Sequence, residues 1–261
     1  MEIAGFGAQV KIRTIPTVTV SDYVIGAGLT AQYPTNNSVT LAIDQAKSFA
    51  VALSTVDSRQ SDLDLADVFA NDGSIQLRIA ADADMLTTIP ADVSADNSGT
   101  TAGADSNDIN LGSAAAPVGV SKTTVVDFIV DCGTVLDEQN VSDEGRWMVA
   151  PPWFIALIKK SDLRIASLAG DGVSILRNGK VGEIDRFTLY QSRNLLTQTT
   201  PGPATYLMFG HSAGLTFASQ VVECQMIDNP NDFGYIIRGL MVYGFEVIGP
   251  NYVGTAVVKK T

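Results

Sequence analysis

Apolar and polar residues alternate along two early stretches of the chain, residues 8–20 and residues 39–53. Alternation with a period of two is typical of a strand that buries one face, so the pattern predicts two long strands. Residues 21–38, which join the two stretches, carry a single charge, Asp22. A loop of this length is uncommon in a compact domain unless it has a function. We therefore expect a long β-hairpin whose tip docks on another surface.

The tip of this hairpin is rich in large apolar side chains. The tip residues that we expect to form an interface are Tyr23, Val24, Ile25, Leu29 and Tyr33. So short a segment cannot build a core of its own, and burial of each larger apolar side chain stabilises a contact by about 1.5–3 kcal/mol. These side chains therefore stay in water unless a partner covers them.

A long acidic helix is predicted over residues 56–89. Leucine, isoleucine and phenylalanine recur there at nearly helical spacing among many aspartates and two arginines, Arg59 and Arg78. Asn71-Asp72-Gly73 is a candidate kink, because glycine in a helix interior costs about 1 kcal/mol relative to alanine.

Helix and strand signals are interleaved over the rest of the chain, which indicates a mixed α+β fold. Residues 91–119 are rich in Ala, Ser, Asn, Asp and Gly and predict an irregular connection. Ser121 is a candidate N-cap for a helix that ends near Asn140. The other predicted elements are a strand over 147–150, a helix from Pro151-Pro152 to Lys159-Lys160, a hairpin around Asn178-Gly179, a helix over 212–219, a strand over 221–227 and a final alternating stretch over 245–257.

The composition favours a chain that associates with a partner. Charged residues make up 17% of the chain and apolar residues 46%, whereas about 25% charge is usual for a soluble domain. Such a deficit suggests that part of the surface is buried against something else, although an ordinary β-rich domain with a Ser/Thr/Asn surface remains an alternative. The formal charge of −11 disfavours a protein that grips nucleic acid with clustered basic residues. A surface that faces packed DNA without holding it remains compatible with this charge.

Cysteine usage and hydropathy indicate a soluble protein in a reducing compartment. Cys132 and Cys224 each lie in an apolar run, so we expect both to be buried free thiols. No stretch approaches the roughly 20 apolar residues needed to cross a bilayer, and the first nine residues lack the features of a secretion signal. We expect no membrane partner.

One string resembles a catalytic motif. Residues 210–214 read Gly-His-Ser-Ala-Gly and match the nucleophile elbow of hydrolases. An elbow serine needs a separate histidine to take its proton, yet His211, directly before Ser212, is the only histidine in the chain. We interpret the string as a glycine-bracketed start of a helix, and expect that the protein is not an enzyme and has no catalytic residues.

Metal and nucleotide sites find no support in the sequence. One histidine and two distant cysteines cannot assemble a structural zinc centre with the usual spacing. The paired aspartates Asp62 and Asp64, and Asp82 and Asp84, lack the glycine and glutamate of a calcium loop. No glycine-rich phosphate loop occurs. We therefore expect no metal and no cofactor.

Several strings, in order over nearly the whole chain, resemble segments of the major capsid proteins of tailed bacteriophages, which have the Hong Kong 97-type fold. A long hairpin followed by a long acidic helix and an α+β body is also similar to that family. The strings are 7–16 (GAQVKIRTIP) with 18–20 (VTV), 41–45 (LAIDQ) with Asp57 and 60–61 (QS), 145–152 (GRWMVAPP), 178–182 (NGKVG), 190–195 (YQSRNL), and 233–234 (FG) with 239–244 (GLMVYG) and Pro250.

The resemblance implies an α+β Hong Kong 97-like capsid fold with an extended β-hairpin loop, a long spine helix, and peripheral and axial domains. It places the N-terminal segment and extended loop in residues 1–55, and the spine helix and peripheral domain in residues 56–117. The axial domain is expected over residues 118–243, and the return to the peripheral domain over residues 244–261.

The function that the resemblance implies is self-assembly into hexamers and pentamers that form the icosahedral shell around a double-stranded DNA phage genome. The protein would belong to the virion and assemble in the host cytoplasm. Scaffolding, portal and decoration proteins are further partners that the family suggests. Packaged DNA would be contacted non-specifically, because an acidic wall repels it weakly.

Two features depart from the family. Members usually carry an N-terminal arm before the extended loop, whereas this chain begins its first alternating stretch at about residue 8, so we assign the arm no residues. Some members crosslink their subunits through a lysine on the extended loop, and residues 21–38 contain none. We therefore expect a non-covalent shell.

Two other functions remain open on the sequence. An encapsulin, a nanocompartment shell with the same fold, needs the same subunit contacts and differs in holding a cargo enzyme in place of DNA. A serine hydrolase using Ser212 is the more remote alternative, and ester turnover would test it.

Overall fold

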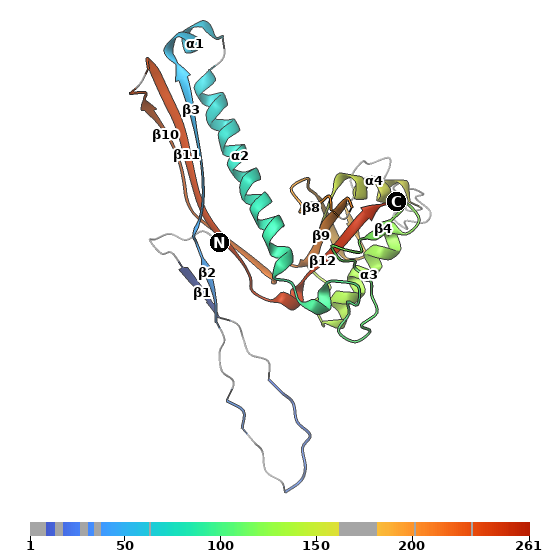
Figure 1. Cartoon of the computed structure of the whole chain (residues 1–261). Helices are drawn as coiled ribbons and strands as arrows, with labels where there is room; N and C mark the ends of the chain where they lie inside the picture. Colours follow the sequence, from blue (N-terminus) through green and yellow to red (C-terminus); the bar gives the residue numbers. More distant parts are fainter. Residues whose placement is uncertain are drawn as a thin grey trace.

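Two bodies and a long hairpin make up the chain (Figure 1). The computed structural model describes residues 9–13, 18–26, 31–33, 38–62, 64–161, 182–200, 202–230 and 232–261. The helices are α1 (Thr55–Gln60), α2 (Leu65–Thr88), α3 (Val125–Glu138) and α4 (Pro152–Lys160), with short 3-10 turns at Ile89–Ala91, Ala95–Asn97 and Pro250–Tyr252. The strands are β1 (Gln9–Arg13), β2 (Ser38–Ala42), β3 (Gln45–Ser54), β4 (Val118–Val120), β5 (Arg146–Ala150), β6 (Glu183–Ile184), β7 (Phe187–Gln191), β8 (Thr197–Gln198), β9 (Ala204–His211), β10 (Leu215–Asp228), β11 (Gly234–Val247) and β12 (Val253–Lys260).

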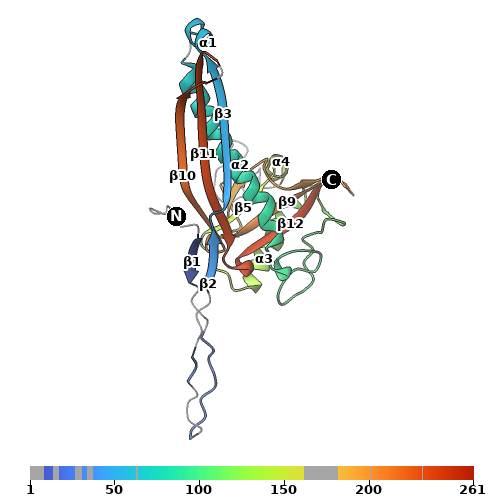
Figure 2. The same cartoon turned by 60° about the vertical axis from the view of Figure 1, so that its left-hand side comes forward.

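The first body, which we call the helix–sheet body, consists of α1, α2 and a three-stranded antiparallel sheet. The strand order is β10-β11-β3, and α2 runs along one face of the sheet. Figure 2 shows the sheet in front of the helix, with α1 at the far end and the β1–β2 hairpin at the opposite end. The hairpin leaves the body where β2 passes into β3, at residues 43–44.

The second body, which we call the seven-stranded body, has strand order β4-β12-β9-β5-β7-β6, with β8 paired to β9. One face of its sheet is covered by α3 and α4. The core between them includes Phe128, Ile129, Phe154, Phe187 and Phe209, all buried. The opposite face receives Leu86 and Ile89 from the end of α2 and its 3-10 turn, which pack with Met208, Val247 and Val253. The end of α2 therefore joins the two bodies.

A glycine slot lets α2 lie close to the sheet. Phe49 of β3 pairs across the sheet with Gly239 of β11. A methyl group added to either Gly239 or Gly73 of α2 would overlap the Phe49 ring. The ring therefore fills the space between two glycines that lie about 166 positions apart in the sequence. The kink predicted at residues 71–73 is wrong, because α2 continues through Gly73, which is buried against this ring.

The helical segment is interrupted earlier instead. Residues 61–64 separate α1 from α2. The side chain of Ser54 caps α1 by accepting from the Val56 backbone N–H, and Asp64 caps α2 by accepting from Asp67. Two side-chain caps ten residues apart therefore start two separate helices where the periodicity alone predicted one.

A polar anchor fixes the second half of α2. Asp84 Oδ2 accepts from Lys47 Nζ at 2.7 Å and from the Tyr243 hydroxyl at 2.5 Å. The Lys47 hydrogen bond, followed by that of Tyr243, holds the pKa of Asp84 below its ordinary value of 3.8. Burial and the Asp84 carboxylate raise the pKa of Tyr243 well above its ordinary value. Helix and sheet are thus tied together by one carboxylate and two donors from two strands.

Several predicted elements are confirmed with shifted ends, and one is wrong. The helices at 121–140 and 151–160 and the strand at 147–150 are present as α3, α4 and β5. Of the described residues in the first predicted strand, Gln9–Arg13 form β1 and residues 18–20 are not in a strand. The helix predicted over 212–219 is wrong, because residues from Leu215 onward form β10, which pairs with β11 through Leu215↔Val247.

The predicted hairpin at Asn178-Gly179, the two cysteines and the domain bounds have different outcomes. The hairpin predicted at Asn178-Gly179 falls outside the described residues, while β6 and β7 turn at Asp185 and Arg186. Cys132 is buried as predicted, but Cys224 is exposed because β10 is an edge strand that α2 does not cover. The chain passes from the seven-stranded sheet to the three-stranded sheet near residues 211–215, where β9 ends and β10 begins, and the domain bounds expected from the resemblance stay a prediction.

Substitution of Gly73 by alanine should destabilise the chain. Helix propensity alone would favour alanine by about 1 kcal/mol. The new methyl group would overlap the Phe49 ring, however, and the ring cannot move away because Gly239 lies on its other side. We expect a lower thermal unfolding temperature for Gly73→Ala, and an unchanged or higher one for the exposed control Asn71→Ala. A double-mutant cycle with Phe49→Ala should show strong coupling. A Gly73→Ala variant that melts above wild type would contradict the slot.

The stabilising effect of Asp84 should disappear in acid. A carboxyl whose pKa is depressed on folding stabilises the fold above its unfolded pKa, and this contribution is lost as the pH falls through the folded value. Asp84→Asn should lower the free energy of unfolding by about 1–3 kcal/mol near neutral pH. In urea titrations this difference should hold down to about pH 5 and shrink below about pH 4. The exposed control Asp82→Asn should show neither effect, and a constant difference down to pH 3 would refute the assignment.

Candidate subunit interface

The described segments of the loop, residues 18–26 and 31–33, lie away from both bodies (Figure 1). Tyr23 and Val24 are exposed, and Ile25 and Tyr33 are 90% and 91% exposed. Leu29 falls outside the described residues. The structure adds two more exposed apolar side chains on the same arm, Val18 and Val20. Within a single chain, nothing covers the described apolar side chains of this tip.

A side-chain amide joins the two arms of the loop. Gln32 Nε2 donates to the Thr19 carbonyl at 2.6 Å, and the Thr19 backbone N–H donates to Gln32 Oε1 at 3.1 Å. Gln32 thereby replaces one rung of a β-ladder. The base of the loop is held by the β1–β2 ladder, from Gln9↔Ala42 to Arg13↔Ser38. The arms are thus held together at two levels before any partner arrives, which reduces the entropy lost on docking.

A second apolar patch lies at the far end of the helix–sheet body, and sequence reasoning missed it. It comprises Val56, Met226, Phe233 and Tyr235, of which Phe233 is 88% exposed. Phe233 lies in the β10–β11 connection, and its carbonyl accepts from the Thr55 backbone N–H at the start of α1. The sequence signal for this patch was a phenylalanine directly after Asn-Asp in a turn, because turns rarely expose a large aromatic side chain unless a partner covers it.

The sheet face turned away from α2 carries a shallow groove. Ser48 and Leu240 are partners across the β3–β11 ladder and lie on the face opposite Phe49. The groove has a volume of about 380 Å³ and is also lined by Ala50 and Arg238. Arg238 donates to Gln225 Oε1 at 2.8 Å from the neighbouring strand. Small residues on β3 leave this face open to a close approach by another chain.

A buried arginine, Arg146, organises one end of the seven-stranded body. The Arg146 side chain is fully buried at the start of β5. It donates to the carbonyls of Ser142 and Val141 at 2.9 and 2.7 Å, and to Asp137 Oδ1 at 2.7 Å. Asp143 Oδ1 lies 3.2 Å from the same guanidinium. A buried charge is tolerated only when it is paired and hydrogen-bonded, and Arg146 meets both conditions.

Arg186 closes this cluster from the β6–β7 turn. It donates to Asp143 Oδ1 at 2.7 Å and to Asp137 Oδ2 at 2.8 Å. Although partial burial alone would raise it, the pKa of Asp137 is held below its ordinary value by the hydrogen bonds from Arg186 and Arg146. Two carboxylates and two guanidinium groups from four chain segments thus form one ionic cluster, which sequence reasoning did not anticipate.

The hydrolase-like string forms a corner between the two bodies. His211 ends β9, and Leu215 begins β10, so the string connects strand to strand and not strand to helix. His211 Nδ1 accepts from the Ala213 backbone N–H at 3.1 Å, and the His211 carbonyl accepts from Gly214 at 3.0 Å. The imidazole therefore stabilises its own turn. Our interpretation of the string as the start of a helix is wrong, and the elbow geometry is also absent here.

Within the described ranges, no group of three or more His, Cys, Asp and Glu side chains is arranged to hold a metal ion. No helix in the described part of the chain is long and apolar enough to cross a membrane.

Comparison with known proteins identifies the fold. No protein-family model and no curated protein matches the chain. A structure from Mycobacterium phage Che8 superposes with a TM-score of 0.72 and 24% identity, over 95% of this chain and 84% of that one. The asymmetric unit of the bacteriophage PhiM1 mature capsid gives a TM-score of 0.66 and 16% identity, over 98% and 82%. The capsid of the native GTA particle gives 0.67 and 12%, over 99% and 86%. The chain therefore has, over nearly its whole length, the fold of these capsid proteins.

The His211–Ser212 corner should support no catalysis. Because the histidine hydrogen-bonds within its own turn, neither Ser212→Ala nor His211→Gln should change the rate at which the purified protein hydrolyses p-nitrophenyl esters. His211→Gln should instead lower thermal stability slightly, by loss of the turn hydrogen bond, at about 1 kcal/mol. Saturable ester turnover that Ser212→Ala abolishes would overturn this assignment.

Proposed function

We propose that this chain, which has the Hong Kong 97-type fold of tailed-phage capsid proteins, is a major capsid protein. In this proposal its copies form hexamers and pentamers that build an icosahedral shell around double-stranded DNA. Assembly would take place in the host cytoplasm, and scaffolding, portal and decoration proteins would be further partners. No catalytic role is part of the proposal.

The observation that carries this proposal is the extended loop. It leaves the body with Val24, Ile25 and Tyr33 in water, although its arms are already held together by Gln32 and Thr19. Covering each of these larger side chains would stabilise a contact by about 1.5–3 kcal/mol. The partner that would cover these side chains is a neighbouring copy of the same chain. The same contact between copies can then repeat around a closed ring.

The two bodies correspond in this proposal to the domains of a capsid subunit. The helix–sheet body, with β3, α2, β10 and β11, would be the peripheral domain, and the seven-stranded body the axial domain at the centre of each capsomer. The exposed patch around Phe233 would then lie at the periphery, where capsomers meet. The axial domain would run over about residues 118–211 and return with β12.

The charge of the chain supports a shell wall that touches DNA without holding it. A formal charge of −11 repels a polyanion weakly. Two exposed lysines, Lys259 and Lys260, lie at the C-terminal end of β12. They supply too little positive charge for a groove that binds a nucleic-acid backbone through its phosphates. Non-specific contact is therefore the expected relation to the genome.

The loop tip should be essential for assembly and dispensable for folding. Val24→Asp with Ile25→Asp removes two exposed apolar groups and adds two charges that docking would have to desolvate. We expect a chain with unchanged circular dichroism and near-normal melting that no longer forms shells in electron micrographs or by sedimentation.

The matched control is Thr100→Asp with Thr101→Asp. It adds the same charge at two exposed positions of an irregular connection away from the loop, and this variant should still assemble. If the loop variant unfolds, the loop packs within its own subunit; if it assembles normally, the loop is not an interface. Nucleic acid extracted from wild-type particles would support a phage shell, whereas a packaged cargo protein without DNA would favour the nanocompartment alternative.

A further inference from the structure

The turn between β6 and β7 has an unusual backbone for its sequence. Glu183 pairs with Thr188 and Ile184 with Phe187, which leaves Asp185 and Arg186 as a two-residue loop. Both have positive φ, 46° and 66°. Turns of this kind strongly prefer Asn-Gly or Asp-Gly, because a side chain at the second position is strained in the left-handed region. Here the second position holds an arginine.

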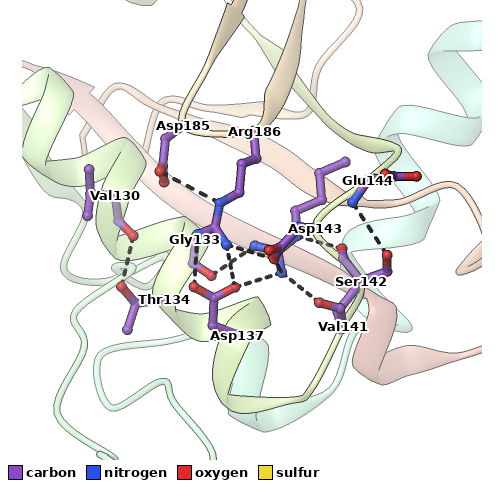
Figure 3. Close-up of polar contacts among 11 residues, drawn as sticks. Val130, Gly133, Thr134, Asp137, Val141, Ser142, Asp143, Glu144, Asp185 and Arg186 are labelled. Atoms are coloured by element: carbon purple, nitrogen blue, oxygen red, sulfur yellow. Dashed lines mark hydrogen bonds and ion pairs between the residues drawn. The ribbon is translucent and has the colours of Figure 1, made fainter.

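The side chain of that arginine offsets the strain of its backbone. Arg186 donates to Asp143 at 2.7 Å and to Asp137 at 2.8 Å, and these carboxylates are themselves held by Arg146 (Figure 3). Arg186 therefore binds two carboxylates whose positions the buried Arg146 already fixes. Charge-assisted bonds of this bidentate kind are among the stronger ones in proteins.

In the part of the chain that the structure describes, the edge strand β6 has few other attachments. Within the described residues, which resume at 182, β6 pairs with β7 alone, at the end of the seven-stranded sheet. Phe187 is buried in the core, but Thr188 and Tyr190 are exposed. Among the described residues, the buried Oδ2 atom of Asp185 has no hydrogen-bond partner, and its Oδ1 atom lies 3.9 Å from Arg186 Nε. Of the polar contacts among the described residues, the Arg186 ion pairs are therefore the main attachment of this turn to the rest of the body.

We propose that Asp185 and Arg186 form a strained latch. The ion pairs of Arg186 with Asp137 and Asp143 keep the turn in its left-handed conformation and hold β6 at the edge of the sheet. Loss of these ion pairs releases residues 183–187 while the rest of the fold stays intact. This inference is independent of the proposed shell function, because it concerns one subunit only.

The latch responds to salt and to acid. The groups that face Arg186 are Asp137 of α3, Asp143 of the α3–β5 loop, Arg146 of β5 and Asp185 of its own turn. Arg186 is 37% exposed on its side chain and Asp143 64%, so dissolved ions screen their attraction. Protonation of Asp137, whose pKa the hydrogen bonds from Arg186 and Arg146 lower, weakens the latch as the pH falls below the ordinary range of a carboxyl group.

Two substitutions at Arg186 distinguish the effect of losing the ion pairs from the effect of relieving the backbone strain. Arg186→Ala removes the ion pairs and keeps a side chain at positive φ. Arg186→Gly removes the ion pairs and the strain together, because glycine adopts this conformation freely. Hydrogen exchange of the full-length chain, followed by mass spectrometry at neutral pH, reports the opening of residues 183–187 directly. Arg193→Ala, an exposed arginine on the following connection, is the control.

The latch predicts an ordered set of results. Arg186→Ala should accelerate exchange of residues 183–187 about tenfold or more, which corresponds to about 1.4 kcal/mol, while peptides of β9 and Arg193→Ala stay at wild-type rates. Arg186→Gly should accelerate the exchange of residues 183–187 less than Arg186→Ala does, because glycine also removes the backbone strain. Raising NaCl to about 1 M should accelerate the wild type and leave both Arg186 variants unchanged. Equal acceleration by alanine and glycine, equal acceleration in β9, or a wild type that ignores salt would each overturn the proposal.

Discussion

The close packing of α2 against the three-stranded sheet is the constraint on which the rest of the structure depends. The Phe49 ring occupies a slot between Gly73 of the helix and Gly239 of the sheet, and Asp84 ties the same helix to Lys47 and Tyr243 further along. The end of α2 then enters the core on one face of the seven-stranded sheet through Leu86 and Ile89. One helix thereby fixes the relative position of both bodies, and the loop that leaves the sheet inherits that position.

The sequence predicts those features that depend on local pattern. The extended loop, α3, α4 and β5 follow from alternation, apolar spacing, and Pro and Asn signals near their ends. The role of Gly73 could not be predicted in this way, because the ring that fills its place comes from residue 49, and glycine in a helix otherwise indicates a kink. Likewise the segment around Phe217 looked helical by itself, but it lies in a strand whose ring stacks on Tyr243, with centroids 6.0 Å apart.

The exposed apolar side chains of the loop could be anticipated for the same reason, whereas their role as an interface stays a prediction. A long, nearly uncharged loop is visible in the sequence, and its exposed side chains are where that pattern places them. The patch around Phe233 and the ionic cluster of Arg146 and Arg186 are assembled by topology from distant segments. The cluster also shows why net charge was a poor guide to individual residues. Lys47, Arg146 and Arg186 are each neutralised by aspartates of the same chain, which leaves the unpaired acids to set the character of the surface.

The pairing of β3 with β11 has a consequence for the order in which the chain is made. β3 ends at Ser54, and the strand that it needs begins at Gly234. A ribosome must therefore add most of the polypeptide before the first long strand finds its place, and until then α2 is an acidic helix without a sheet to lie on. The body that carries the extended loop cannot mature on a half-made chain. Translation therefore delays formation of the helix–sheet body until the chain is nearly complete.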